Sequence, residues 1–303
     1  MKWYILYCIL SLGVNNMTGI HIIDALLSIL VSICMLFTGF MDSGDATSTP
    51  EVELVREDKL LSIDAMKSGQ GVATDGKYFY TSGSLTAFGM TSITKRDAET
   101  MEVLVKNDSP IPQEYIDDYG SDHVGGISYY DGKIYAAVEN EAEDLPLVIT
   151  YDARTLHIVD IFELPNTDLP DGIPWCCVDG ENGYLYCSQF NEVNEIIAFD
   201  LETMEFSHVI PLSEQVVRIQ GGEVYDGVLY LSSDIADSND DKIITVEVGS
   251  GLVKELCTRS LPSVAGNEAE GITVFPMEDG TFIHVLDYDK TVGVYLRHYK
   301  LTE

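Results

Sequence analysis

The sequence repeats itself at intervals of about fifty residues, and this repeat constrains the fold more than any other feature. Five segments share a short apolar stretch, a tight turn that is most often Asp-Gly, and an alternating stretch rich in aromatic residues. They begin at Gly71, Gly126, Cys176, Gly222 and Gly271, with spacings of 55, 50, 46 and 49 residues. Asp-Gly between alternating stretches favours a β-hairpin. Each segment therefore predicts one hairpin.

A second hairpin follows in each of the first four units. Its turn begins at an acidic residue (Asp97, Asp152, Asp200 or Glu247), and a Thr or Ser lies three residues later. Such side chains can cap the backbone of their own turn. Four antiparallel strands repeated at this interval are typical of a β-propeller blade. We predict an all-β, five-bladed β-propeller over residues 51–303, without a helical pattern.

The fifth unit lacks room for a fourth strand before the sequence ends. Residues 59–65 form a short apolar segment ahead of the first unit, with nothing else to pair with. An unpaired edge strand invites aggregation. We therefore predict that residues 59–65 close the ring as the outer strand of blade five.

Residues 1–45 have the composition of a signal peptide or membrane anchor followed by a linker. The apolar run at residues 25–40 is short for a membrane span and suits the core of a signal peptide. Lys2 precedes it, and Asp42 and Asp45 follow it. This charge bias predicts an extracytoplasmic protein, secreted or anchored, that meets the membrane only through this segment.

The chain is strongly acidic, with 50 Asp and Glu against 17 Lys and Arg and a formal net charge of −33. A field of this sign repels phosphate backbones, so we expect no nucleic-acid partner. The propeller region holds four cysteines, Cys176, Cys177, Cys187 and Cys257. Export permits disulfides, and both buried free thiols and a single bridge remain open.

In a propeller, the residues before each inner strand and those after each second strand lie at the same end of the axis. Loops on a rigid ring are a common location for functional residues. Before the inner strands are Gln70, His123, Trp175, Arg218, Gln220, Glu268 and Glu270. After the second strands are Asn140, Asn191, Asp234, Asp287 and Asp289.

We predict His123 and Glu270 as the catalytic, proton-carrying pair, because a carboxylate among other acids has a raised pKa. The alternative for Glu270 is a structural ion pair with Arg218. Arg218 could instead clamp an anionic ligand, and Trp175 either stacks on a ligand or packs between blades. The other predicted ligand-binding residues are Gln70, Gln220, Glu268, Asn140 and Asn191.

Calcium is the one cofactor for which the sequence offers candidate ligands. The oxygen-rich loop with Asp234, Asp237, Asn239 and Asp241 could hold it, and Asp287 and Asp289 could add ligands. The loop lacks the glycine and the distal glutamate of an EF-hand. Acidic loops are also expected in so acidic a chain, so a bound calcium ion stays an alternative.

The order of these features resembles the glutamine cyclotransferase family, the plant- and bacterial-type glutaminyl cyclases. The resemblance is carried by residues 70–72, 80–84 and 97–103, by Gly89 and by Trp175. It implies a five-bladed propeller that converts N-terminal glutamine to pyroglutamate. The family has a glutamate between the glycines where this chain has Gly125-Gly126, and Asn-Glu-Leu-Glu where this chain reads residues 219–223.

The pattern also resembles a looser group of uncharacterised secreted bacterial propellers. Their signatures before successive inner strands are His-x-Gly-Gly, Pro-Trp, Gln-Gly-Gly and Glu-x-Glu-Gly. In this chain these begin at His123, Pro174, Gln220 and Glu268. This second resemblance covers the candidate site better and implies no known reaction.

The leading hypothesis is a monomeric extracytoplasmic propeller that binds a small molecule, peptide end or glycan in an axial pocket, with catalysis left open. One alternative is a cyclotransferase-type enzyme without a redox cofactor. Another is a cell-surface scaffold that binds proteins and performs no chemistry.

Overall fold

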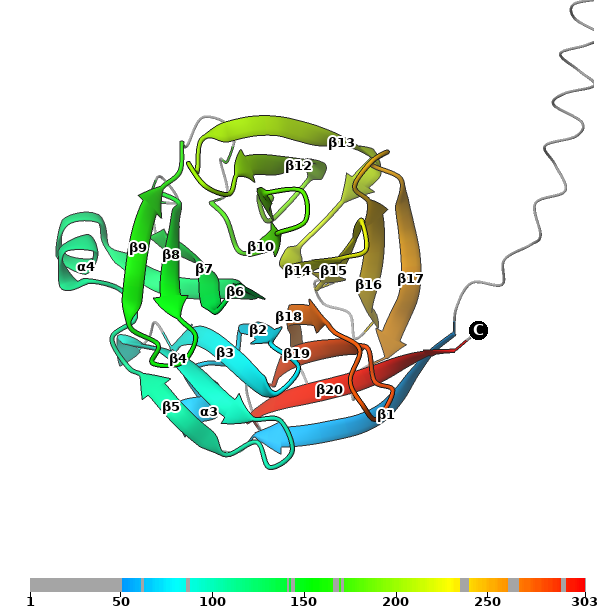
Figure 1. Ribbon diagram of the computed structural model, residues 1–303, viewed down its shortest axis with the longest axis horizontal. Coiled ribbons are helices and arrows are strands. Elements are labelled where there is room, and N and C mark those ends of the chain that lie inside the picture. Colours follow the sequence, from blue (N-terminus) through cyan, green and yellow to red (C-terminus); the bar gives the residue numbers. More distant parts are fainter. Residues whose placement is uncertain are drawn as a thin grey trace, which may run out of the picture. The chain divides into compact units, whose positions relative to one another are not determined.

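The computed structural model describes residues 51–60, 63–85, 88–140, 142, 145–165, 169, 172–234, 240–260, 267–289 and 293–302. Within this part of the chain, five four-stranded antiparallel sheets surround a central axis, as Figure 1 shows. The prediction of an all-β, five-bladed propeller is confirmed. Residues 1–45 and the predicted signal or anchor segment lie outside the described residues. Among the described helices, none has the length and apolar character needed to cross a membrane.

Each blade runs from an inner strand at the axis to an outer strand at the rim. The strands of the five blades, in this order, are β2 (Gly71–Thr74), β3 (Tyr78–Leu85), β4 (Met90–Asp97) and β5 (Val103–Asn107); β6 (Ser121–Tyr130), β7 (Lys133–Asn140), β8 (Leu147–Asp152) and β9 (Ile158–Glu163); β10 (Cys176–Asp179), β11 (Tyr184–Cys187), β12 (Val193–Asp200) and β13 (Phe206–Val216); β14 (Ile219–Tyr225), β15 (Val228–Ser233), β16 (Asp240–Glu247) and β17 (Val253–Ser260); and β18 (Asn267–Val274), β19 (Ile283–Asp289), β20 (Gly293–Thr302) and β1 (Glu51–Leu60).

The turns between the third and fourth strands repeat the capping device that the sequence predicts. In blade three, Asp200 Oδ1 accepts hydrogen bonds from the Thr203 backbone N–H at 2.9 Å and from the Thr203 hydroxyl at 3.0 Å. Blades one and two repeat both bonds at Asp97 and Asp152. The residue after the threonine then has a positive φ, as at Met204 with 55°. The turn therefore depends on the acidic side chain to hold an unfavourable backbone conformation.

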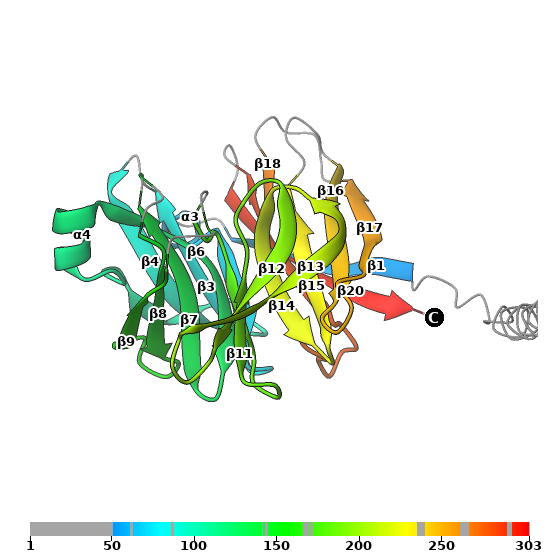
Figure 2. The same cartoon turned by 90° about the horizontal axis from the view of Figure 1, so that it is seen from above.

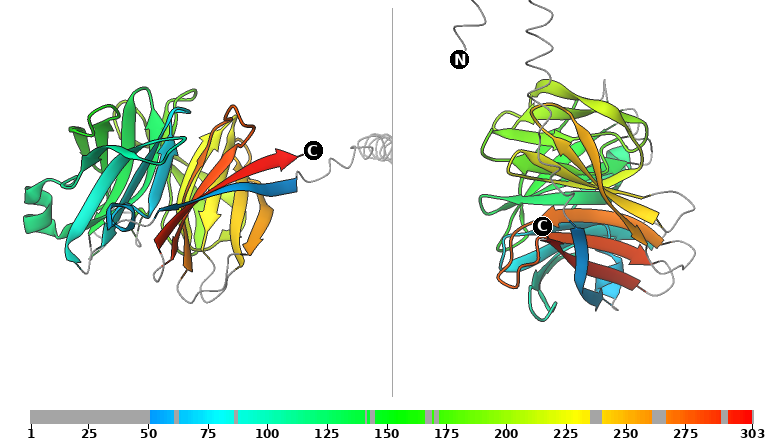
Figure 3. Two further views of the ribbon diagram at one scale, coloured as in Figure 1. Left: turned by 90° about the horizontal axis from the view of Figure 1, so that it is seen from below. Right: turned by 90° about the vertical axis from the view of Figure 1, so that its right-hand side faces the viewer.

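The outer strand of blade five is β1, which pairs antiparallel with β20 from Glu51 opposite Thr302 to Leu60 opposite Val294. Figure 3 shows the blue β1 beside the red β20. The prediction placed this strand at residues 59–65, but most of that segment lies beyond β1, and Ile63–Met66 forms the short helix α3. The charged residues of 51–58 are compatible with a strand because an outermost strand exposes much of its surface.

A second helix, α4 (Gln113–Tyr119), joins blades one and two and ends at Gly120, whose φ is 70°. Two short helices therefore form in a region whose sequence shows no periodic helical pattern. Both helices are too short for a helical periodicity to be recognisable in the sequence.

The inner strands meet at glycines, and their backbones come into contact around the axis. A Cβ placed on Gly71 would lie 2.5 Å from the Gly125 carbonyl oxygen, and one on Gly271 would lie 2.8 Å from Gly71 Cα. Gly126 and Gln220 belong to blades that are not neighbours, yet a Cβ on Gly126 would lie 3.4 Å from the Gln220 carbonyl oxygen. The axis is therefore filled by backbone at this level.

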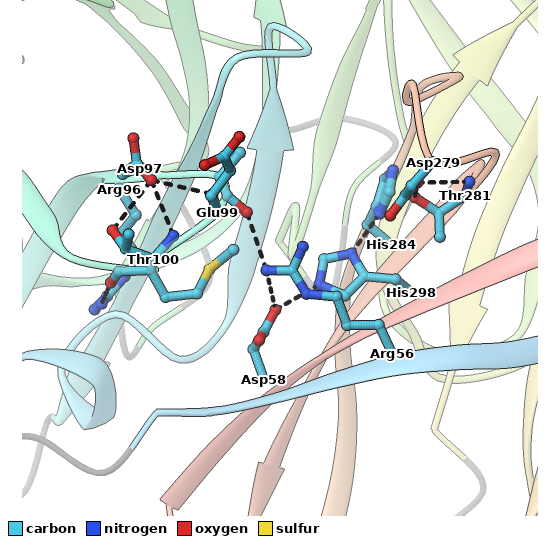
Figure 4. A network of polar contacts seen from close by, with 12 residues as sticks. Arg56, Asp58, Arg96, Asp97, Glu99, Thr100, Asp279, Thr281, His284 and His298 are labelled. Carbon is cyan, nitrogen blue, oxygen red and sulfur yellow. Dashed lines mark hydrogen bonds and ion pairs between the residues drawn. The ribbon is translucent and has the colours of Figure 1, made fainter.

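A polar network in blade five ties β1 to the strands behind it (Figure 4). His284 Nε2 contacts the Phe275 carbonyl oxygen at 3.2 Å, so this nitrogen carries the proton. Burial, and then the nearby charge on His298, lower the pKa of His284 to about 3. The neutral His284 therefore accepts a hydrogen bond at Nδ1 from His298 Nδ1, at 2.7 Å.

The other nitrogen of His298, Nε2, lies 2.9 Å from Asp58 Oδ2 in β1. Arg56 Nη2 also contacts Asp58, at 2.7 Å, and donates to the Ala98 carbonyl oxygen at 3.0 Å. Burial raises the pKa of Asp58, but hydrogen bonds from His298 and Arg56 outweigh it, and the net pKa is lowered. Arg56, Asp58 and His298 thus fasten β1 to blade one and to the rest of blade five.

We predict that Gly71→Ala lowers the free energy of unfolding by about 3 kcal/mol, because the new methyl group would overlap backbone of blade two. Gly249→Ala is the matched control, since a Cβ there meets no atom within 4 Å. Urea unfolding followed by far-ultraviolet circular dichroism measures both. Equal stabilities for the two variants would contradict backbone contact at the axis.

We predict that the chain loses stability as the pH falls from about 6.5 towards 3, in part because His284 must take up a proton that it excludes when folded. The unfolded chain binds this proton first, so this group contributes a loss of up to about 1.4 kcal/mol per pH unit. His284→Gln should flatten the slope of unfolding free energy against pH, whereas His157→Gln, at an exposed site, should leave it unchanged. An unaltered slope in His284→Gln would refute the assignment.

Candidate functional site

The structure brings the beginnings of the inner strands to one end of the axis, where the predicted site residues lie. Gln70 precedes β2, His123 lies near the start of β6, and Glu268 and Glu270 lie near the start of β18. The Gly271 backbone N–H donates to the Gln70 carbonyl oxygen at 2.6 Å, which joins blade five to blade one. We call this the strand-start end, and Figure 1 shows how its inner strands converge.

Gln70 and His123 form a hydrogen-bonded pair between blades one and two. The Gln70 Oε1 accepts a hydrogen bond from the Ser84 backbone N–H at 2.8 Å, which fixes the orientation of the amide. The Gln70 Nε2 must then face His123, and it lies 3.1 Å from His123 Nε2. Because the amide nitrogen is the donor, His123 Nε2 is unprotonated and the ring carries its proton on Nδ1.

The electrostatic environment agrees with this neutral form of His123. Burial, the dominant cause, lowers the pKa of His123 below its usual value of 6.5, and the nearby Asp122 only partly opposes it. Ser84 supports the arrangement a second time, because its hydroxyl accepts the Val124 backbone N–H at 2.9 Å. The imidazole is thus held in one tautomer by contacts from both blades.

The two predicted acids of blade five differ in burial. Glu270 is 3% exposed, whereas Glu268 is half-buried. Glu270 immediately precedes Gly271, the residue whose amide bonds Gln70, so its backbone lies beside the Gln70–His123 pair. A buried carboxyl from blade five and a neutral imidazole from blade two therefore lie at this end of the axis, on either side of blade one.

Arg218 is engaged by its own blade. Its Nη2 forms an ion pair with Asp234 Oδ2, and its Nε donates to the Asp234 carbonyl oxygen at 3.0 Å. Its guanidinium also lies over the Phe190 ring, 4.9 Å from the centroid. The predicted partner, Glu270, is therefore replaced by Asp234. Arg218 has a φ of 51°, an uncommon conformation for a residue other than glycine.

Trp175 has no surface on which a ligand could stack, because it is fully buried. Its Nε1 donates to the Ser188 hydroxyl at 3.1 Å, and its ring fills the space where a Cβ of Gly222 would lie. The stacking role is therefore wrong, and the alternative of packing between blades holds.

The amide residues after the second strands differ in their roles. Asn140 is 4% exposed; its Nδ2 donates to the Tyr119 carbonyl oxygen at 3.0 Å, which fixes the end of α4. Its predicted role in ligand binding is therefore replaced by a structural one. Asn191 and Gln220 remain half-buried at the strand-start end.

Two of the predicted metal ligands, Asp287 and Asp234, are bound to arginines instead. Asp287 is 2% exposed and contacts Arg259 Nη1 with both oxygens at 2.9 Å, and Arg297 Nη1 binds the same carboxylate. Asp234 is neutralised by Arg218 in the same way. Asp237, Asn239 and the side chain of Asp289 lie outside the described residues. In the part that is described, no group of three or more His, Cys, Asp or Glu side chains could hold a metal ion.

The four cysteines of the propeller are free thiols, three of them buried and Cys257 half-buried. The alternative of a disulfide among them is therefore overturned. Burial raises the pKa of Cys176 and Cys177 well above the usual range, so these thiols are neutral packing groups.

Sequence reasoning missed Glu223, whose carboxyl lies on the axis at the opposite end. It is 8% exposed and accepts hydrogen bonds from Ser128 of blade two at 3.1 Å and Thr273 of blade five at 3.4 Å. Its signal in the sequence is an acid at an inner-strand position where blade two has serine. The departure from the family pattern at residues 219–223 drew attention to this segment, without assigning Glu223 a role.

Comparisons with known proteins support the fold. No protein-family model and no curated protein matches the chain. The crystal structure of glutaminyl cyclase from Myxococcus xanthus is similar over 84% of this chain and 97% of its own, with a TM-score of 0.59 and 14% sequence identity.

Two further solved structures show weaker likeness. Hydrazine synthase from Kuenenia stuttgartiensis is similar over 78% of this chain and 59% of its own, with 16% identity and a TM-score of 0.44. The nidogen/laminin complex is similar over 66% of this chain and 86% of its own, with 11% identity and a TM-score of 0.42. These two support no conclusion about this chain. The first confirms the suspected resemblance to the glutaminyl cyclases at the level of a five-bladed propeller.

Proposed function

We propose that this propeller binds a small polar ligand, such as a peptide end, a glycan or another small molecule, at the strand-start end of its axis. The observation that carries the proposal is the Gln70–His123 hydrogen bond, which holds a neutral imidazole in one tautomer. Such a group is a preorganised polar contact on a rigid ring. The buried Glu270 of blade five supplies a second proton-carrying group.

The chemistry available to the ligand follows from this tautomer. His123 Nδ1 is the donor, and His123 Nε2 is already occupied by Gln70. A ligand carbonyl or hydroxyl oxygen therefore suits the imidazole. Arg218 is neutralised by Asp234, so recognition of an anion has less support than recognition of neutral or cationic groups.

A second candidate is a glutaminyl-peptide cyclotransferase, favoured by the likeness to the Myxococcus enzyme over almost its whole length. In this reaction the amine of an N-terminal glutamine attacks its own side-chain carbonyl carbon. The new C–N bond closes a five-membered lactam, and the C–N bond to the amide group breaks to release ammonia. Glu270 would take a proton from the attacking amine and return one to the leaving ammonia. Gly125-Gly126 lacks the glutamate that the family carries there.

The extracytoplasmic location belongs to the same proposal. Its support is the apolar run at residues 25–40 and the acidic residues that follow it. A protein-binding scaffold remains the alternative if neither ligand nor substrate is found.

We predict that peptides, glycans or small molecules which raise the melting temperature of the full chain will lose this effect in His123→Ala. His157→Ala is the matched control, because His157 is exposed on a turn of blade two and should leave ligand stabilisation intact. The melting temperatures of the wild type, His123→Ala and His157→Ala are measured by thermal unfolding with each member of a ligand library. Ligands that stabilise His123→Ala as well as the wild type would place binding elsewhere and contradict the proposal.

For the second candidate, we predict that the full chain releases ammonia from peptides with N-terminal glutamine. Mass spectrometry detects the reaction as a decrease in peptide mass by that of one ammonia molecule. Glu270→Gln should reduce the rate by about a hundredfold or more if Glu270 transfers protons. Glu205→Gln, on an exposed turn, is the control. Loss no faster than the spontaneous rate would exclude the cyclotransferase and leave the binding proposal standing.

A further inference from the structure

A second recess lies on the axis, at the end where the inner strands finish. Its volume is about 670 Å³, and residues from all five inner strands or the turns after them line it. The glycine contacts between Gly71, Gly125, Gly221 and Gly271 fill the axis between this recess and the strand-start end. The two ends of the axis are therefore separate sites, and we call this one the strand-end recess.

Glu223 contributes the carboxyl group at the inner part of this recess. It receives hydrogen bonds from the hydroxyl of Ser128, at 3.1 Å and 3.4 Å, and from that of Thr273 at 3.4 Å. The Val178 backbone N–H donates to Ser128 Oγ at 3.2 Å, which orients that hydroxyl. Four blades thus position one carboxyl group on the axis.

Aromatic rings lie at the mouth of the recess, and two of them pack against the backbone of the neighbouring blade. Tyr130 lies over Gly180 and Phe275 lies over Gly76, because a Cβ on either glycine would overlap the ring. Tyr225 meets Phe282 edge to face, with centroids 5.1 Å apart. Tyr130, Tyr225 and Phe275 are each more than a third exposed, so their surfaces face solvent in a preformed arrangement.

The charge of the recess has one sign. Besides Glu223 it is lined by Asp75, Asp179, Glu181 and Asp226, and no Lys, Arg or His is among the lining residues. Asp75 and Asp179 are fixed by tyrosine hydroxyls, from Tyr80 at 3.0 Å and Tyr186 at 3.3 Å. The acids and the aromatic mouth together attract a positively charged ligand that also has apolar surface.

We propose that the strand-end recess binds an organic ammonium ion. The ammonium group contacts the Glu223 carboxylate and donates to the oxygens of Ser128 and Thr273. The alkyl part lies against the rings of Tyr130, Tyr225 and Phe275. A calcium or magnesium ion fits less well, because it requires six or more oxygen ligands, and the inner part of the recess offers one carboxylate and two hydroxyls.

The protonation of Glu223 links this binding to pH. Burial raises its pKa to about 8, and hydrogen bonds from Val224, Ser128 and Thr273 offset this only in part. The groups next to it on neighbouring strands are uncharged: Ser128 on β6, Cys176 and Cys177 on β10, Tyr230 on β15 and Thr273 on β18. The charged groups that line the same recess are the acids Asp75, Asp179, Glu181 and Asp226. An ammonium ion displaces the proton of Glu223, so affinity rises with pH up to about 8.

The test uses n-butylammonium chloride with the full chain, measured by isothermal titration calorimetry, and butan-1-ol as the uncharged control of similar shape. We expect butylammonium to bind at pH 8.5, at least tenfold more weakly at pH 6.5, and butan-1-ol not to compete. Glu223→Gln should weaken binding at least tenfold, while Glu205→Gln leaves it unchanged. Tyr225→Ala, at the exposed mouth, should weaken it about threefold and provides a test if Glu223→Gln fails to fold.

Four outcomes would overturn the proposal. The first two are that butylammonium gives no heat of binding with the folded chain, or that butan-1-ol binds as well as butylammonium does. The other two are that folded Glu223→Gln and Tyr225→Ala keep the wild-type affinity, or that calcium chloride binds and butylammonium does not. Ligand binding at the strand-start end is measured separately with His123→Ala, so failure of either proposal is distinguishable from failure of the other.

Discussion

Backbone contact between inner strands is the constraint on which the rest of this structure depends. Five sheets meet so closely that Gly71, Gly125, Gly221 and Gly271 have no room for a side chain. Everything polar near the axis must therefore lie above or below these glycines. Gln70 and His123 lie on one side, and Glu223 lies on the other. The tight centre thus produces two candidate sites in one ring.

Three arginines of this acidic chain bind carboxylates that are buried. Arg259 and Arg297 share Asp287, and Arg218 neutralises Asp234. A buried carboxylate without such a partner pays a large desolvation penalty unless it takes up a proton. Glu223 is held only by neutral donors, which explains why its pKa is raised. Pairing with arginine therefore distinguishes Asp234 and Asp287 from Glu223.

The sequence was sufficient to predict the fold, because each hairpin carries its own turn residues. In the turns at Asp97, Asp152 and Asp200, the aspartate and the threonine that it binds are three residues apart, so the contact can be predicted from the sequence alone. Side-chain partners were harder to predict, because they depend on which blades face each other. Trp175 and Asp287 occupy positions that suit a site, yet one fills a space over Gly222 and the other is held by two arginines. Glu223 was overlooked because its partners Ser128 and Thr273 are distant in the sequence.

The pairing of β1 with β20 has a consequence for how the chain acquires its structure during synthesis. Glu51 opposes Thr302, so the first strand of the propeller that is synthesised has no partner until β20 has been made. Blades one to four are each continuous in sequence and can form in turn, whereas blade five needs both ends of the propeller. Contacts between such distant residues form slowly. A nascent chain therefore carries an unfinished ring until β20 has been synthesised.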